Sequence, residues 1–182
     1  MILIIDMNAK KDGLGHLEFV RPVERIILAS GFKAFSRHYT RVSAADLKKA
    51  GKVILSGTPL IDNAFLADAD RFAWLATFDK PVLGICAGMQ AIASALGGEV
   101  IEAREIGMIK VRTVKKNPLF SGEFEAYALH GNAVKPGADF EVLAESERCV
   151  QAFRHRKRSI YGILFHPEVR NEKIIEKFCG LK

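Results

Sequence analysis

Residues 82–90, VLGICAGMQ, join an apolar, strand-like run to the start of a helical pattern through a cysteine. Gly84 and Gly88 flank Cys86 at a distance of two residues on either side. This pattern parallels the nucleophile elbow of hydrolases, in which glycines permit a tight turn that exposes the residue between them at the carboxyl edge of a sheet. The start of the helix also favours the thiolate form of Cys86. The stretch therefore predicts a nucleophile, with a buried structural cysteine as the alternative.

The regions around this stretch indicate an α/β protein, because apolar runs alternate with helical patterns up to residue 98. Strands are expected at residues 2–5, 32–36, 52–56 and 81–85, and helices at residues 18–30, 68–77 and 87–96, with a short helix after a capping-box-like Ser43. Further strands are expected at residues 99–103, 107–114, 123–129, 139–144, 149–155 and 159–165, followed by a helix at 171–178. The expected fold is an open, mostly parallel sheet flanked by helices, with a strand-rich second half, in a single domain over residues 1–182.

The composition is that of an ordinary globular protein, since 49% of the residues are hydrophobic and 26% are charged, which excludes disordered, collagen-like and coiled-coil chains. No apolar run approaches the roughly 20 residues of a membrane-spanning helix, and no secretory signal is expected before the first strand. The cysteines at positions 86, 149 and 179 are too widely spaced for a disulfide framework or a zinc cluster. We therefore expect a cytoplasmic protein without a metal site, in which Cys149 and Cys179 are structural.

The net charge of +6 raises the question of a nucleic-acid partner. The dense basic run is Arg154–Arg158, which lies between two strand-like segments. It carries no interleaved aromatic residues, which a protein that binds single strands would need. We therefore interpret the run as a solvated hairpin turn rather than a phosphate-binding patch, and the sequence does not favour nucleic acid or a membrane as partner.

A thiolate nucleophile needs a general base, and His166 has the most suitable surroundings among the five histidines. It follows the strand-like segment at residues 159–165, and Glu168 stands two residues further on. A histidine at a strand end, with a carboxylate close enough to orient its ring, completes the nucleophile, base and orienting group of a triad. The predicted catalytic residues are thus Cys86, His166 and Glu168. The alternative is a strand end that carries polar residues by chance.

With these residues in place, the sequence resembles the class I glutamine amidotransferases. That family carries the motif G-x-C-x-G-x-Q and, further along the chain, F-H-P-E, which correspond here to residues 84–90 and 165–168. A third landmark, an S-G-G-P turn, has its counterpart in Ser56-Gly57-Thr58-Pro59. The resemblance extends over essentially the whole chain and implies the flavodoxin-like, three-layer fold of the family.

The resemblance also implies a reaction, the hydrolysis of L-glutamine to glutamate and ammonia through a thioester on Cys86. His166 would deprotonate the thiol, protonate the departing ammonia and then activate water, while Glu168 fixes the imidazole ring. Backbone N–H groups would hold the oxyanion. The positions implied for the oxyanion and for substrate binding are Gly57, Thr58, Ala87, Gln90, Gly131 and Asn132.

The sequence departs from the family pattern at three places. Thr58 replaces the second glycine of the S-G-G-P turn, and a β-branched residue would be strained there if the position requires a positive φ. Such a turn would become competent only when a partner docks. Leu164 stands where the family commonly has glutamine, and the first loop, residues 8–18, is longer than usual.

Within the family, residues 127–132, YALHGN, resemble the W-x-S-H-G-D region of the glutaminase domains of GMP synthases. The sequence contains no P-loop and no S-G-G-x-D-S loop of the ATP pyrophosphatases, so the chain does not activate an acceptor itself. We expect a glutaminase subunit without a cofactor of its own, which supplies a separate synthetase of the ATP pyrophosphatase type that binds ATP and magnesium. Two alternatives remain open: a stand-alone γ-glutamyl hydrolase, active without any partner, and a catalytically weak binding subunit, inactive with or without one.

Overall fold

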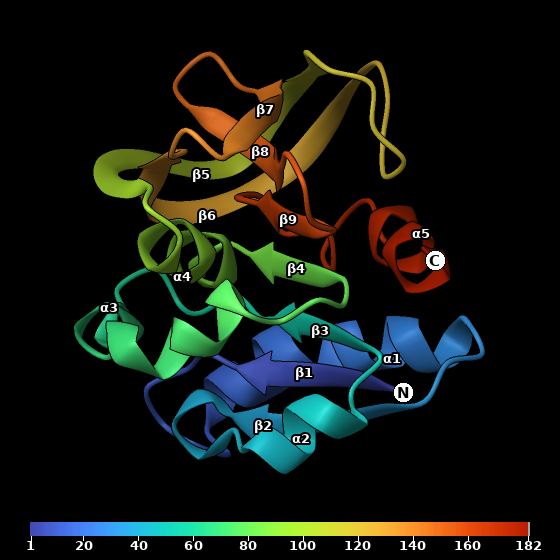
Figure 1. The fold of residues 1–182 in the computed structure, drawn as a ribbon. Helices are drawn as coiled ribbons and strands as arrows, with labels where there is room; N and C mark the ends of the chain where they lie inside the picture. The colour runs from blue at the N-terminus through green and yellow to red at the C-terminus, as the bar shows by residue number, and fades with distance from the viewer. Residues whose placement is uncertain (182) are drawn as a thin grey trace.

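The computed structural model describes residues 1–181, which form one sheet of nine strands with helices on both faces (Figure 1). The strand order across the sheet is β2-β1-β3-β4-β9-β8-β7-β5-β6. The strands are β1 (Ile2–Asp6), β2 (Ala34–His38), β3 (Lys52–Leu55), β4 (Val82–Ile85), β5 (Glu99–Thr113), β6 (Glu123–Lys135), β7 (Phe140–Glu145), β8 (Val150–His155) and β9 (Ile160–Ile163). The α-helices are α1 (Arg21–Ala29), α2 (Ala44–Lys49), α3 (Ala64–Ala67), α4 (Ala87–Ala95) and α5 (Lys173–Gly180). Within this part of the chain, the helices are too short or too polar to cross a membrane.

The parallel half of the sheet consists of β2, β1, β3, β4 and β9. Every residue of β1 and β4 is buried, because helices cover both faces of these strands. Ile4 and Ile54 belong to the core on the face covered by α1 and α5. Leu3 and Leu55 belong to the core on the opposite face, beneath α3 and α4. The result is three layers, with the carboxyl ends of the parallel strands at one edge of the sheet.

The antiparallel half consists of β8, β7, β5 and β6, and it curls over the parallel half (Figure 1). The last strand of the order, β6, therefore returns to the segment that follows β9. The N–H of His166 donates a hydrogen bond to the carbonyl of Tyr127 in β6 at 2.8 Å, and α4 contacts both β5 and β6. A strand at the far end of the sheet thus lies beside the carboxyl edge of the parallel half.

The predicted α/β fold is confirmed, including the helix-flanked open sheet and the strand-rich second half. Among the described strands, parallel and antiparallel pairs are equal in number, four of each. The capping box is also confirmed. The hydroxyl of Ser43 accepts a hydrogen bond from the N–H of Asp46, whose carboxylate accepts one from the N–H of Ser43.

Several expected elements differ in detail. The helix predicted at 18–30 is instead a π-helical turn, His16–Val20, followed by α1. Pro22 favours the start of a new helix at this point, because it has no N–H to donate to the preceding turn. The helix predicted at 68–77 is a 3₁₀ segment, Ala69–Ala76. Its buried residues, Phe72 and Leu75, stand three apart, which is the period of a 3₁₀ helix. The strands predicted at 99–103 and 107–114 form the single strand β5, which contains a β-bulge rather than a turn.

Candidate active site

Cys86 occupies the turn between β4 and α4, at the carboxyl edge of the parallel strands. Its backbone angles are φ 47° and ψ −103°. A residue with a side chain rarely adopts this conformation, which costs about 1–3 kcal/mol. The N–H of Cys86 donates to the carbonyl of Ile163 at 2.7 Å and thereby fastens the turn to β9. The sharp strand-to-helix turn predicted from the sequence is therefore present, and it carries backbone strain at the expected nucleophile.

The two glycines around Cys86 are required by close backbone packing. A Cβ atom on Gly84 would lie 2.4 Å from the carbonyl carbon of Gly88. A Cβ atom on Gly88 would lie 2.5 Å from the carbonyl oxygen of Leu55 in β3. Neither approach is possible for a real side chain, so α4 can pack directly on β3 and β4 only if both positions are glycine. This explains the spacing of the motif in steric terms.

His166 and Glu168 follow β9 and form a buried pair. The Nδ1 atom of His166 lies 2.8 Å from the Oε1 atom of Glu168. A carboxylate oxygen accepts, so Nδ1 carries the proton and Nε2 is left to face another group. Within residues 1–181, Nε2 has no hydrogen-bond partner. Phe19 packs on the same ring, with the two ring centres 5.4 Å apart.

The charge state of His166 is set by opposing effects. Burial lowers the pKa of the imidazole, but the Glu168 carboxylate and the Cys86 sulfur outweigh it, so the pKa of His166 lies well above the usual value for histidine. The raised pKa favours the protonated ring, and a protonated ring stabilises a neighbouring thiolate. His166 thus has the electrostatic surroundings that the acid–base partner of a thiol nucleophile requires.

The turn after β3 approaches His166 from the other side. A Cβ atom on Gly57 would lie 2.6 Å from the Cε1 atom of His166, so glycine is required where the ring approaches the turn. Thr58 is buried, and its hydroxyl donates to the carbonyl of Asp62 at 2.9 Å. Thr58 does not have a positive φ. The strain considered for Thr58 in the sequence is therefore absent, because the turn places this residue in ordinary backbone geometry.

A narrow cavity of about 10 Å³ lies between the Cys86 turn and β6. Among the residues predicted for the site, those that line it are Thr58, Cys86, Gln90, Gly131 and Asn132. A cavity of about 10–15 Å³ admits a single water molecule, so in this conformation the cavity cannot hold an amino acid. The remaining predicted residues, Gly57, Ala87, His166 and Glu168, are buried beside it. Ala87 is the first residue of α4, and its N–H therefore has no partner within the helix.

Polar groups on the two sides of this cavity bind one another. The Nε2 atom of Gln90 donates to the carbonyl of Asn132 at 3.3 Å, and the thiol of Cys86 lies 3.8 Å from the carbonyl oxygen of Leu129. The Oε1 atom of Gln90 is buried and has no partner in the described part of the chain. The side chain of Asn132 donates to Asn63 at 3.2 Å. Asn63 was not predicted from the sequence, because no local pattern marks a residue 69 positions away from its partner.

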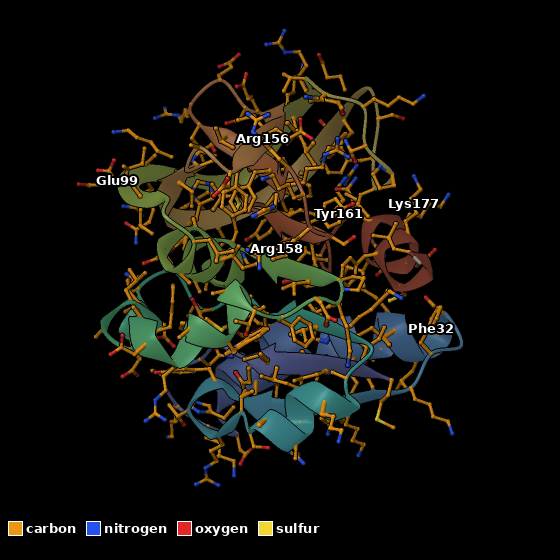
Figure 2. The ribbon with its side chains drawn as sticks, viewed as in Figure 1. Phe32, Glu99, Arg156, Arg158, Tyr161 and Lys177 are labelled. Atoms are coloured by element: carbon orange, nitrogen blue, oxygen red, sulfur yellow. The ribbon has the colours of Figure 1, made fainter. Side chains whose placement is uncertain are left out.

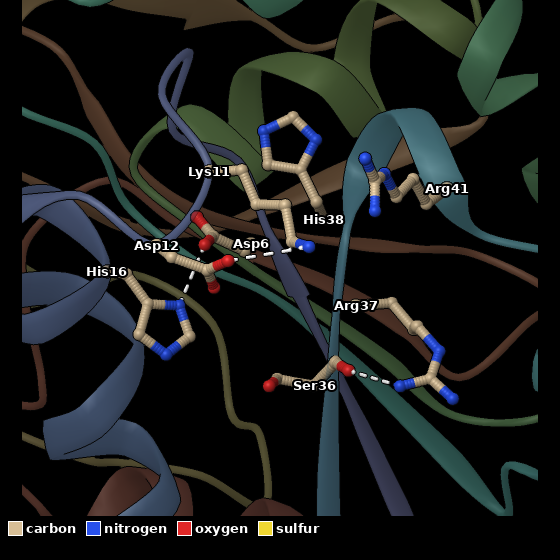
Figure 3. A pocket seen from close by; sticks show the side chains of 8 residues that line it. All are labelled: Asp6, Lys11, Asp12, His16, Ser36, Arg37, His38 and Arg41. Atoms are coloured by element: carbon tan, nitrogen blue, oxygen red, sulfur yellow. Dashed lines mark hydrogen bonds and ion pairs between the residues drawn. The ribbon is translucent and has the colours of Figure 1, made fainter.

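A second, larger cavity of about 490 Å³ lies at the carboxyl ends of β1 and β2 (Figure 3). Its charged walls come from Asp6, Lys11, Asp12, His16, Arg37, His38 and Arg41. Much of this charge is already paired: the Nδ1 atom of His16 lies 2.8 Å from Asp6, and Lys11 lies 3.4 Å from Asp12. The long first loop predicted at residues 8–18 supplies Lys11, Asp12 and His16, so it forms one wall of this cavity and not of the cavity at Cys86.

The basic run Arg154–Arg158 lies at the hairpin between β8 and β9, as predicted (Figure 2), but only Arg156 and Lys157 are exposed, so the run is less solvated than expected. Arg158 points inward, and its Nη1 atom donates to the carbonyls of Leu75 and Ala76 at 2.7 and 3.1 Å. Arg154 forms an ion pair with Glu141. Because these two cations are used within the fold, the run does not form a continuous phosphate-binding surface.

The other two cysteines lack the surroundings of Cys86. Burial raises the pKa of Cys149 to about 12 and the pKa of Cys179 to about 11. Both therefore remain uncharged thiols near neutral pH, which is consistent with the structural role predicted for them.

The sequence and the fold both resemble those of known proteins. A family model described as "Glutamine amidotransferase class-I" matches residues 19–178. A GMP synthase (glutamine-hydrolysing) subunit from Methanococcus maripaludis is 44% identical over 138 residues, which cover 70% of this chain and 71% of the relative. The GMP synthase subunit of the same name from Methanocaldococcus jannaschii is 42% identical over 143 residues, which cover 72% and 74% of the two chains.

Solved structures agree with these matches. A Thermoplasma acidophilum protein, provisionally described as a GMP synthase subunit, superposes with a TM-score of 0.84 at 26% identity, over 99% of this chain and 93% of that one. A glutamine amidotransferase from Thermotoga maritima superposes with a TM-score of 0.73 over 97% of this chain and 80% of that one. Its identity is 19%, so this second likeness concerns the fold alone.

Proposed function

Because the chain belongs to the class I glutamine amidotransferase family, we propose that it is the glutaminase subunit of a two-subunit GMP synthase. The observation that carries the proposal is the arrangement around Cys86. A strained turn presents the thiol, and the adjacent His166 is oriented by Glu168 and has a raised pKa. This is the arrangement of an activated thiolate nucleophile and its acid–base partner.

The proposed reaction begins with attack of the Cys86 sulfur on the side-chain amide carbon of L-glutamine. His166 donates its proton to the amide nitrogen as the carbon–nitrogen bond breaks, which releases ammonia and leaves a thioester. His166 then accepts a proton from water, whose oxygen attacks the thioester carbon, and the thiolate leaves with glutamate as the second product. One glutamine and one water thus give one glutamate and one ammonia.

The residues around the thiol divide the remaining tasks. The N–H groups of Ala87 and Thr58 would hold the oxyanion, since Ala87 begins α4 and Thr58 lines the cavity. The buried Oε1 atom of Gln90 has no hydrogen-bond partner among residues 1–181, so it could accept a hydrogen bond from the substrate. Gly131 and Asn132 would contact the backbone groups of glutamine from β6.

The closed cavity supports a role for a partner. At about 10 Å³ it must widen before glutamine can enter, and a docked synthetase would favour the wider state by binding it more tightly. The curated relatives are subunits of GMP synthase by name. We propose that the partner is a synthetase of the ATP pyrophosphatase type, which binds ATP and magnesium and uses the ammonia to aminate a nucleotide.

The experiment that tests this proposal measures ammonia release from glutamine by the wild-type chain and by Cys86→Ala. Each is assayed alone and with the candidate synthetase, ATP, magnesium and the acceptor nucleotide. Turnover that depends on the partner and is lost in Cys86→Ala supports the proposal. Equal turnover with and without the partner would instead indicate a stand-alone γ-glutamyl hydrolase. Equal, low release by both proteins under every condition would indicate a binding subunit.

A further inference from the structure

A β-bulge in β5 lies directly opposite the β6 wall of the cavity at Cys86. Glu102 pairs with Asn132 and Glu105 pairs with His130, so two residues of β5 stand opposite Gly131 alone. A bulge leaves backbone groups out of the regular ladder and re-aims nearby residues, and it is often found beside active sites. The wall at Gly131 therefore takes its shape from the bulge behind it.

His130 fastens this bulge from β6. Its Nδ1 atom lies 3.0 Å from the carbonyl oxygen of Ala103, one of the two bulged residues. A carbonyl oxygen only accepts, so Nδ1 carries the hydrogen and satisfies a carbonyl that the bulge displaces from the ladder. The side chain of His130 is fully buried, and its Nε2 atom lies 3.3 Å from the Oε2 atom of Glu105. The bulge thus fixes the ring at Nδ1, while Nε2 packs against the Glu105 carboxylate without a hydrogen-bond partner among residues 1–181.

Glu105 is itself held from the opposite side by groups on β8 and the turn before it. Its Oε2 atom accepts hydrogen bonds from the Nε2 atom of Gln151 at 2.6 Å and from the hydroxyl of Ser146 at 3.1 Å. The thiol of Cys149 lies 3.3 Å away. A buried carboxylate with several donors is costly to disturb, because removing it leaves those donors unpaired. Glu105, at the edge of the bulge, therefore ties β8 to the bulge and packs against the ring of His130 behind the cavity wall.

We propose that Glu105 and His130 are positioning residues that set the affinity of the site for glutamine. They act through the backbone of residues 129–132. The carbonyl oxygen of Leu129 lies 3.8 Å from the Cys86 thiol, and the carbonyl oxygen of Asn132 accepts a hydrogen bond from Gln90. The inference rests on the proposed glutaminase function. A small displacement of this wall changes how glutamine is held, while Cys86 stays in the turn after β4 and His166 and Glu168 stay in the segment after β9, which β6 contacts at Tyr127 rather than at the wall.

The same cluster has a competing interpretation as a metal site. One ligand atom from each of Glu105, His130 and Cys149 lies within 4.8 Å of the others. The donors from Gln151 and Ser146 already occupy Glu105, however, and a cation there would face the amide of Gln151. We therefore favour positioning over metal binding, and a metal analysis is one part of the test.

The test measures steady-state glutamine hydrolysis by the complex with the synthetase. Glu105→Gln removes the charge and keeps the shape, and it should raise KM for glutamine about 10-fold while kcat stays within about 2-fold. A merely destabilised protein would lose active enzyme and hence apparent kcat, but not affinity. The matched control is Glu141→Gln on β7. It removes another buried carboxylate, which forms ion pairs with Arg154 and Lys115. Its KM should equal that of the wild type.

A second pair of variants tests the proposal if Glu105→Gln does not fold. His130→Asn keeps a side-chain N–H that can reach the Ala103 carbonyl, whereas His130→Leu keeps none. We expect Asn to preserve KM within about 3-fold and Leu to raise it about 10-fold. Equal KM values for His130→Leu and the wild type, or one equivalent of zinc that is lost in Cys149→Ser, would overturn the proposal. Absence of glutamine turnover in the wild-type complex would instead count against the proposed function.

Discussion

The cavity at Cys86 and the cavity at the ends of β1 and β2 lie at the same edge of the sheet and differ in almost every property. The first measures about 10 Å³ and includes the buried Cys86, Gln90 and His130 in its lining, whereas the second measures about 490 Å³ and is lined mainly by charged side chains, several of them exposed (Figure 3). Each cavity has a non-glycine residue with a positive φ, Cys86 at the first and Asp12 at the second. Only at the first does this residue stand between glycines required by backbone packing and near a fully buried ion pair. The comparison shows that neither the size of a cavity nor strain alone locates chemistry in this protein; a strained cysteine near a fully buried histidine–carboxylate pair does.

The largest effect on activity is expected when the thiol of Cys86 is removed. Cys86→Ala should lower kcat for glutamine hydrolysis by about 10⁴-fold or more, because no other group can form the thioester. The control is Cys179→Ala, which removes a buried thiol in α5 and should leave kcat within about 2-fold. Similar losses in both variants would show that the small cavity is not the reactive one.

The next effect concerns the carboxylate that orients the base. Glu168→Gln should lower kcat by about 10²–10³-fold, because the imidazole loses its orienting partner and its charge stabilisation. The Glu168 carboxylate raises the pKa of His166, so its removal lowers that pKa. The basic limb of kcat/KM against pH should therefore move to lower pH in the variant. A basic limb that stays in place would contradict the assigned pairing.

A stability measurement tests the dense packing around Cys86. Gly88→Ala places a Cβ atom 2.5 Å from the Leu55 carbonyl, and it should lower the free energy of unfolding by about 3 kcal/mol in urea titrations. Gly180→Ala is the matched control, because a Cβ atom there meets nothing within 4 Å. Its effect should stay below about 0.5 kcal/mol. Equal stabilities for the two variants would mean that the turn is less tightly packed than described.

The smallest effect on activity and stability is expected from a substitution in the large cavity. Arg41 is exposed and forms no interaction with the other residues drawn in Figure 3. Arg41→Ala should leave the glutaminase activity of the complex with the synthetase within about 2-fold and the free energy of unfolding within about 0.5 kcal/mol. A loss of activity comparable to that of Glu168→Gln would place catalysis in the large cavity.

Local features of the fold and site could be predicted from the sequence. The buried strands, the capping box at Ser43 and the turn at Cys86 follow from apolar runs, side-chain chemistry and glycine spacing, all within a few residues. The pairing of His166 with Glu168 could also be predicted, because the two residues are only two positions apart in the chain. Each of these depends on physics that acts over one or two turns of backbone.

The features that were missed depend on long-range geometry. The return of β6 to His166 follows from the curl of the whole sheet, which no local pattern encodes. The bulge opposite Gly131 brings Ala103 and His130 together from positions 27 residues apart. The conformation of Thr58 depends on its contact with Asp62 and on the packing of the turn, so residue type alone suggested a strain that the fold does not impose.

The most direct test of the central claim is labelling with the diazoketone analogue of glutamine, followed by mass spectrometry of the modified peptides. We predict one adduct per chain, on Cys86, formed in the presence of the synthetase, blocked by excess glutamine and slowed by His166→Ala. Cys149 and Cys179 should remain unmodified, because burial raises the pKa of their thiols to about 12 and about 11. An adduct on either of these cysteines, or an unmodified Cys86 in an active complex, would contradict the account.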